Sequence, residues 1–135
     1  MVVDASMAIA WLFGEERTEA TEAAFQRVTD GDAFVPSLWR LEVANSLWSA
    51  IRRKRCDEKY AVQSLDRLRR LNIVTDGDTD KHAWGQTRAL SAQHQLSVYD
   101  AAYLELALRR GSTLATLDTA LAKAGRKRGL SVISN

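Results

Sequence analysis

Short runs rich in β-branched and other apolar residues alternate with longer helical segments along this chain. Strands are expected at five places, each followed by a turn or a helix-capping residue: residues 1–4, 33–35, 72–74, 113–116 and 130–133. Because parallel strands need a crossover between them, strands separated by helices favour a parallel sheet with right-handed connections. The pattern therefore predicts an α/β fold, with a mostly parallel central sheet of about five short strands and helices on both faces.

Helical periodicity fills the intervals between these strands. Helices are expected at about residues 6–13, 15–29, 38–53, 57–71, 80–94 and 97–110, with a last one beginning at Asp118. In the third helix Ser37 is the expected N-cap, Glu42 shares a polar face with Asn45 and Ser49, and the expected apolar stripe comprises Leu41, Ala44, Trp48 and Ile51. Positions 101–108 are apolar nearly all round, which predicts a central, buried helix.

The length and composition suit one globular domain. The 135 residues are 46% hydrophobic and 27% charged, so we expect a single domain, residues 1–135, that buries roughly two thirds of its unfolded surface. The apolar stretch from Ala5 to Phe13 has no basic leader and is too short to span a bilayer. Cys56 is the sole cysteine and forms no zinc pattern with His82 or His94, which fits a reducing cytoplasm.

Charge is unevenly distributed, although the net charge is only +2. Residues 1–51 carry eight acids and three bases, whereas residues 52–135 carry sixteen bases and nine acids. The bases cluster at residues 52–55, 67–70, 109–110 and 123–128. Such clusters suit either a nucleic-acid phosphate backbone or a solvated helix face, and the sequence alone leaves both interpretations open.

Four acidic residues lie where an apolar run meets a turn or a helix: Asp4, Glu42, Asp100 and Asp118. Asp4 and Asp118 follow predicted strands, and α/β sheets bind ligands at the edge where the carboxyl ends of their strands lie. Each acid alone has a structural explanation as a helix cap or a partner of the helix dipole. Carboxylates gathered in one cleft repel each other unless a cation neutralises them, so together the four indicate a site for a hard divalent cation.

Four sequence blocks carry these acids: Val-Val-Asp-Ala-Ser near the start, Pro-Ser-Leu-Trp-Arg-Leu-Glu-Val-Ala-Asn in the middle, Ser-Val-Tyr-Asp-Ala-Ala-Tyr-Leu-Glu-Leu-Ala later and Leu-Ala-Thr-Leu-Asp-Thr-Ala-Leu near the end. In order and rough spacing they resemble PIN-domain ribonucleases, most closely the VapC-type toxin branch, over essentially the whole chain. Two features depart from that pattern. Only three residues precede Asp4, and Glu105 is an additional acid, expected to face elsewhere because five residues rotate a helix by about 140°.

The resemblance implies a Mg²⁺ or Mn²⁺ site made by the four acids. Asp4, Glu42 and Asp100 would hold the principal ion, and Asp118 would hold a second ion or position a water. The small polar residues that match the neighbouring family positions are Ser6, Asn45 and Thr116, which would orient carboxylates and water. With such a site the chain would hydrolyse RNA phosphodiester bonds with a metal-activated water, and no nucleophilic Ser, Cys or His would be needed.

The resemblance also implies partners. The chain is expected to be a cytoplasmic toxin that forms a homodimer and is silenced by a small cognate antitoxin, which places an arginine against the acids. RNA phosphates are expected to bind at Arg52, Arg53, Arg109 and Arg110. The tryptophans recur on apolar stripes and are expected to pack in the core or at a subunit contact: Trp11, Trp39, Trp48 and Trp84.

Three other functions compete with this interpretation. A receiver-type signalling domain also binds Mg²⁺ at strand ends, but it needs a phosphoacceptor aspartate after a middle strand, where this chain has Glu42 inside a helix. A haloacid-dehalogenase-like phosphatase needs a second aspartate two residues after the first, and Ser6 occupies that position. A non-catalytic RNA-binding member of the same fold stays open, although degenerate forms typically lose some of the acids.

Overall fold

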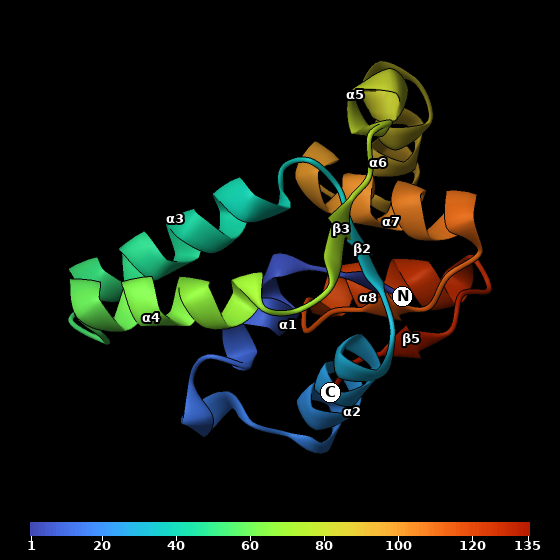
Figure 1. Ribbon diagram of the computed structural model, residues 1–135. Coiled ribbons are helices and arrows are strands. Elements are labelled where there is room, and N and C mark those ends of the chain that lie inside the picture. The colour runs from blue at the N-terminus through green and yellow to red at the C-terminus, as the bar shows by residue number, and fades with distance from the viewer.

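Five short parallel strands form one sheet in the order β3-β2-β1-β4-β5, in a computed structural model that describes residues 1–135 (Figure 1). The strands are β1 (Val2–Val3), β2 (Ala33–Val35), β3 (Ile73–Thr75), β4 (Leu114–Ala115) and β5 (Val132–Ile133). Every neighbouring pair is parallel. The predicted α/β class and the parallel five-stranded sheet are therefore confirmed.

The strand order reverses at β1, because the chain first builds outward to β2 and β3 and later returns to place β4 on the other side of β1. Val2 is consequently in register with Phe34 on one side and with Leu114 on the other. The carboxyl ends of β1 and β4 lie side by side, and the Asp4 amide donates a hydrogen bond of 3.1 Å to the Ala115 carbonyl. In doubly wound sheets, this reversal opens the crevice that binds ligands.

Eight α-helices connect and cover these strands: α1 (Ala5–Ala10), α2 (Glu19–Asp30), α3 (Trp39–Arg52), α4 (Glu58–Arg69), α5 (Thr79–His82), α6 (Arg88–His94), α7 (Val98–Arg110) and α8 (Thr119–Lys127). A 3₁₀ turn, η1 (Gly14–Glu16), precedes α2, and a π-type turn, η2 (Ala83–Thr87), joins α5 to α6. In Figure 1, α3 and α4 run side by side, while α5 and α6 stand together above α7. None of the helices combines the length and the apolar character that crossing a membrane requires.

Helix α7 is the central helix, as the sequence predicts. Every residue from Ala101 to Ala107 is buried, and α7 contacts β1, β4, α6 and α8. Ser97 caps its first turn, accepting a hydrogen bond of 3.0 Å from the Asp100 amide, and Gly111 ends it with a φ of +60°. Because the cap position belongs to Ser97, the Asp100 side chain is free of that role.

The predicted apolar stripe of α3 is wrong at three of its four positions, and only Ile51 packs against the core. Leu41 is 75% exposed and Trp48 is 55% exposed, whereas the buried residues of this helix are Trp39, Val43, Leu47 and Ala50. Both sets follow helical spacing, and a single sequence does not say which of them meets α1 and α4. The polar face is retained, and Glu42 and Asn45 line the same pocket.

Several helix boundaries differ from the prediction, and the first helix already ends at Ala10 instead of near Phe13. The second helix begins at Glu19, because Thr18 and Thr21 form a capping box there and leave residues 14–16 as a 3₁₀ turn. Leu38, without a side-chain hydrogen bond, takes the N-cap position of α3, and the Ser37 amide instead donates to Thr79 Oγ1 at 2.9 Å. The predicted helix 80–94 is interrupted at Gly85, whose ψ of −105° is not helical.

Candidate active site

A polar pocket at the carboxyl ends of β1 and β4 contains all four predicted acids. They come from four separate places: Asp4 follows β1, Glu42 lies in α3, Asp100 in α7, and Asp118 follows β4. The other residues that line the pocket are Ala5, Ser6, Asn45, Ser46 and Tyr103. Of the three predicted small polar neighbours, Ser6 and Asn45 line the pocket, and Thr116 is buried beneath Asp4.

Asp4 is the most deeply placed of the acids, with only 4% of its surface exposed. Its Oδ1 accepts hydrogen bonds from the Ser6 hydroxyl at 2.7 Å and from the Met7 amide at 3.0 Å, and its Oδ2 accepts one from the Thr116 hydroxyl. Burial raises the pKa of Asp4 to about 6, because these three donors only partly offset the loss of hydration. A nearby cation would supply the missing compensation.

Ser6 and Thr116 also tie the β4–α8 loop to the start of α1. Ser6 Oγ accepts from the Leu117 amide at 3.0 Å, and Thr116 Oγ1 accepts from the Asp118 amide at 3.0 Å. Each hydroxyl therefore joins Asp4 to the loop that carries Asp118. Both residues hold two of the acids in position relative to each other.

Tyr103 also lines the pocket, although none of the sequence patterns indicated it as a site residue. Its side chain is almost entirely buried, and its hydroxyl donates a hydrogen bond to Glu42 Oε1. Burial and the neighbouring carboxylates raise the pKa of Tyr103 far above its ordinary value, so the hydroxyl stays protonated and acts as a donor. Its position three residues after Asp100 places both side chains on one face of α7, which is the signal that could have indicated it.

Glu42 and Asp100 both sit in partly dehydrated positions. Burial, followed by the charge of Asp100, raises the pKa of Glu42, and the Tyr103 hydrogen bond opposes that rise. Burial, followed by the charge of Asp118, raises the pKa of Asp100. Asp118 is the N-cap of α8, and its Oδ1 accepts from the Leu121 amide at 2.8 Å. Asp118 therefore caps α8 with Oδ1, as one of the sequence explanations expected, and its Oδ2 takes no part in that hydrogen bond.

The donor atoms of this pocket are carboxylate, hydroxyl and amide oxygens, which is the set that Mg²⁺ and Mn²⁺ prefer. No three acidic, histidine or cysteine side chains are close enough together to form a ready-made chelate. Mg²⁺ does not need one, because it is commonly held by one or two carboxylates and keeps several of its waters. The residues therefore fit a hydrated divalent cation.

Glu105, the additional acid, faces away from the pocket, as predicted. Its Oε1 accepts a hydrogen bond of 2.7 Å from Arg109 Nε and lies 3.8 Å from His82 Nδ1. Arg109 also binds Asp76 Oδ2 at 2.6 Å, which holds the pKa of Asp76 below its ordinary value. This network joins α7 to the turn after β3, so Glu105 has a structural partner.

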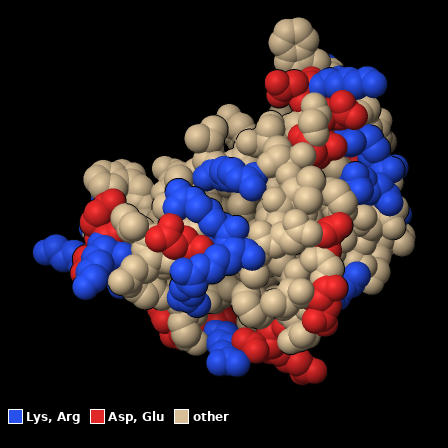
Figure 2. All heavy atoms as spheres, in the orientation of Figure 1, with Lys and Arg blue, Asp and Glu red and all other residues tan.

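The four predicted RNA-binding arginines fall into two groups. Arg52 and Arg53 are exposed at the end of α3, where they line a small hollow with Ser49. Arg109 is held by Asp76 and Glu105, and the Arg110 guanidinium lies 3.4 Å from the centre of the Phe34 ring. Figure 2 shows basic side chains gathered over α3 and α4, with acidic ones among them.

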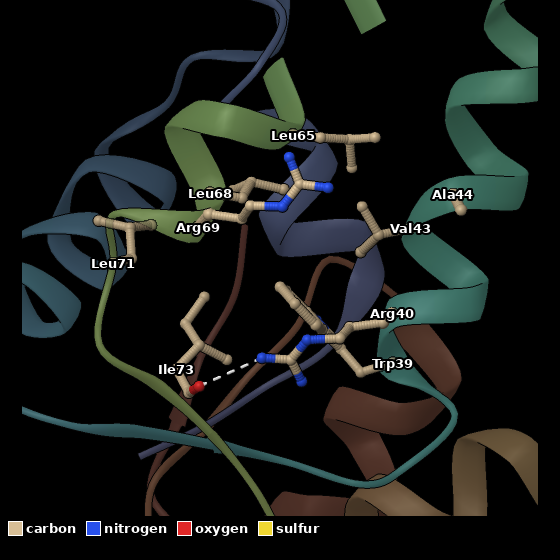
Figure 3. A pocket seen from close by; sticks show the side chains of 9 residues that line it. All are labelled: Trp39, Arg40, Val43, Ala44, Leu65, Leu68, Arg69, Leu71 and Ile73. Carbon is tan, nitrogen blue, oxygen red and sulfur yellow. Dashed lines mark hydrogen bonds between the residues drawn. The ribbon is translucent and has the colours of Figure 1, made fainter. Parts of the chain in front are cut away.

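A second pocket, between α3 and α4, has a different character. Apolar side chains such as Val43, Leu65 and Leu68 form most of its wall, and Arg40 and Arg69 are its only charged residues (Figure 3). Arg40 reaches across to the edge of the sheet and donates to the Ile73 carbonyl at 3.4 Å. Without a carboxylate, this pocket offers no ligand set for a divalent cation.

Two of the four tryptophans pack inside the protein, and the other two are exposed. Trp39 is 4% exposed and belongs to the core, and Trp11 packs edge-on against Phe25 with ring centres 5.5 Å apart. Trp48 and Trp84 are exposed, with 92% of the Trp84 surface accessible. Core packing was therefore the wrong expectation for these two, and a subunit contact stays a prediction.

Comparison with known proteins gives consistent matches. A family model described as PIN domain matches residues 1–127. Ribonuclease VapC3 from Pyrobaculum aerophilum is 36% identical over 127 residues, which cover 91% of this chain and 92% of that protein. The crystal structure of PAE2754 from Pyrobaculum aerophilum has a TM-score of 0.69 at 22% identity and covers 98% of this chain and 87% of its own. VapBC2 from Rickettsia felis, solved with a DNA fragment from its promoter, has a TM-score of 0.65 at 14% identity, with 99% of this chain and 97% of that chain covered.

Proposed function

This chain belongs to the PIN-domain family, in its VapC-type branch, and from that premise we propose that it is a Mg²⁺- or Mn²⁺-dependent endoribonuclease and the toxin of a toxin–antitoxin pair. The observation that carries the proposal is the convergence of four carboxylates from separate elements in one pocket. Neither histidine nor the cysteine lines this pocket, so its own side chains supply no nucleophile–base pair of the Ser-His or Cys-His kind.

In this proposal each residue of the pocket has a distinct role. Asp4, Glu42 and Asp100 would hold the principal ion, some of them through its bound waters, and Asp118 would hold a second ion or position the attacking water. When bound, the metal neutralises the carboxylates, lowers the pKa of a water and stabilises charge on the phosphate. Thr116 and Ser6 keep the Asp4 carboxylate in one orientation, and Tyr103 does the same for Glu42. Asn45 offers an amide in the wall of the pocket.

A cleavage assay with a charge-neutral variant tests this proposal. Asp4→Asn keeps the size of the side chain and removes its charge, so we expect RNA cleavage with Mg²⁺ or Mn²⁺ to fall by about 10²-fold or more, and EDTA to stop the wild type. Asp66→Asn, on the exposed face of α4, is the matched control and is expected to cleave normally. Circular dichroism checks that both variants are folded.

Two results would contradict the assignment. Full activity of Asp4→Asn would exclude Asp4 as a ligand. A wild type that binds RNA but does not cut it with either metal would instead support a non-catalytic RNA-binding protein. Mapping the cleavage ends on total RNA would identify the target, which neither the motif nor the pocket specifies.

The partners belong to the same proposal. We expect a homodimer and a cognate antitoxin with an arginine against the acids, because a guanidinium forked onto carboxylates competes with a metal ion for the same oxygens. Relatives support the antitoxin, since one structural neighbour is a VapBC2 complex. Co-purification with the product of an adjacent small reading frame tests the antitoxin, and sedimentation tests the dimer. The cytoplasmic location likewise stays a prediction.

A further inference from the structure

We propose that Ser49, Arg52 and Arg53 form a phosphate-binding subsite at the C-terminal end of α3, and that a single RNA strand runs to it along this helix from the acidic pocket. The inference rests on the proposed ribonuclease function. It adds to that function the path of the RNA on the protein, the single-stranded state of the RNA and the shortest RNA that reaches both sites.

The first observation is that Arg52 and Arg53 are free. Neither side chain forms a hydrogen bond or an ion pair within the protein, and both are exposed. Arg55, in the same basic cluster, is held by Glu15 at 2.7 Å and also by Glu16. Of the other two predicted RNA-binding arginines, Arg109 is held by carboxylates and Arg110 stacks on an aromatic ring. Arg52 and Arg53 are therefore the pair that is available to an external anion.

The second observation is the hollow that these two arginines line. Ser49 completes its wall, and no carboxylate or apolar side chain contributes. Guanidinium forks and a hydroxyl donate hydrogen bonds to phosphate oxygens, and without an acid in the hollow nothing repels an anion. The chemistry of the hollow thus matches a phosphate group.

The third observation is that the hollow and the acidic pocket share one face of α3. Glu42, Asn45 and Ser46 line the pocket, and Ser49, Arg52 and Arg53 follow them at three- and four-residue steps. Ten residues of helix separate Glu42 from Arg52, a rise of about 15 Å. Roughly two to three nucleotides of an extended strand span that distance.

Trp48 favours an unpaired strand over a duplex. It is 55% exposed and lies one helical turn before Arg52, beside the polar face. An exposed indole stacks on any base whose face is open, whereas bases inside a duplex are not available. Phosphates on the polar face and a base on Trp48 use two adjacent strips of the same helix.

A binding series in Ca²⁺ measures this path, because a hard cation neutralises the carboxylates of the acidic pocket and lets a phosphate approach them. Each probe is checked on a gel afterwards to show that it was not cut. The probes are fluorescein-labelled, mixed-sequence single-stranded RNAs of about two to eight nucleotides, and the readout is anisotropy at several salt concentrations. The affinity of the wild type should rise steeply once the probe spans both sites. The double variant Arg52→Ala/Arg53→Ala should lose that rise, so that its affinity for the longer probes is about tenfold lower than that of the wild type. The slope of log affinity against log salt concentration should also become shallower by about 0.7, because one phosphate contact is lost.

Arg67→Ala/Arg70→Ala is the matched control. It removes two arginines at the end of α4 whose side chains also have no hydrogen bond or ion pair and line neither the pocket nor the hollow. We expect its affinities to stay within about twofold of the wild type. A blunt RNA duplex of the same length should bind the wild type more weakly than the single strand.

Each contrary result would overturn a particular part of the proposal. Equal losses in the two double variants, the same loss at every probe length, or no binding of any probe to the wild type would overturn the subsite. Equal binding of duplex and single strand would overturn the single-stranded path. Cleavage with Mn²⁺ is assayed separately, so a wild type that cuts RNA but shows no arginine effect refutes the subsite alone.

Discussion

Tyr103 shows how a single buried hydroxyl can hold a carboxylate of the pocket in one orientation. Its ring fills space in the core, and its only polar atom points at Glu42 across 61 residues of sequence. A buried tyrosine needs a hydrogen-bond partner, and a partly dehydrated glutamate needs a donor, so each residue satisfies the other. We therefore place Tyr103 as a positioning residue for Glu42.

Tyr103→Phe tests this role because it removes the hydroxyl and keeps the ring. Outer residues that orient metal ligands typically account for about 10- to 100-fold in affinity or activity, and we expect a loss of about tenfold in Mn²⁺ affinity by titration calorimetry. Tyr99→Phe, at an exposed position four residues earlier, is the control and should bind Mn²⁺ normally. Unchanged Mn²⁺ affinity in Tyr103→Phe would leave the tyrosine with a packing role only.

Helix α7 is held to the turn after β3 by one ion-pair network. Arg109 bridges Glu105, which is 4% exposed, and Asp76, which is 7% exposed, while only a quarter of its own side chain is accessible. Because α7 also carries Asp100 and Tyr103, this network steadies one wall of the acidic pocket. It also explains why Arg109, unlike Arg52, is not available to an external phosphate.

Arg109→Ala should destabilise the fold more than it affects RNA binding. Removing the arginine leaves two buried carboxylates unpaired, so we expect the free energy of unfolding, measured in urea, to fall by about 3 kcal/mol. Arg69→Ala removes an exposed pair with Asp66, and the expected change there is below about 1 kcal/mol. A small effect of Arg109→Ala on unfolding together with a large loss of RNA binding would reverse this assignment.

At the scale of the whole molecule, the acidic pocket lowers the free energy of unfolding near neutral pH. Burial raises the pKa of Asp4, Glu42 and Asp100, so the folded protein binds protons more tightly than the unfolded chain. As pH rises from about 4, the unfolded chain loses these protons first, and stability falls. The loss due to Asp4 is complete once pH passes its folded pKa of about 6.

Asp4→Asn should therefore be more stable than the wild type above that pH when metal is absent. The shift corresponds to a gain of about 1–3 kcal/mol in the free energy of unfolding near neutral pH in EDTA, since each pKa unit is worth about 1.4 kcal/mol. Urea unfolding at about pH 4.5 and about pH 7.5 measures it, and the difference between variant and wild type should shrink at the lower pH. A variant less stable than the wild type at both pH values would contradict the sign.

Much of this protein follows from the order of its residues. The alternation of apolar runs and helical periods is enough to predict the five parallel strands, and Asp4 and Asp118, which follow two of them, are predicted at the carboxyl edge of the sheet. The apolar residues around Asp100 are enough to predict a buried helix, because a helix without a polar face cannot lie at the surface. A local sequence pattern is enough to predict an element when that pattern is stable in only one environment, such as the interior of the protein.

Only tertiary packing decided the rest. Two stripes of α3 have helical spacing, and contact with α1 and α4 selected Val43 and Leu47 for the core, which left Leu41 and Trp48 outside. The sequence also did not reveal that Tyr103 and Arg109 have hydrogen-bond partners and that Arg52 has none. These contacts depend on side chains that are distant in sequence. Periodicity describes what each segment can bury, whereas the other segments determine which face is buried and which charges stay free.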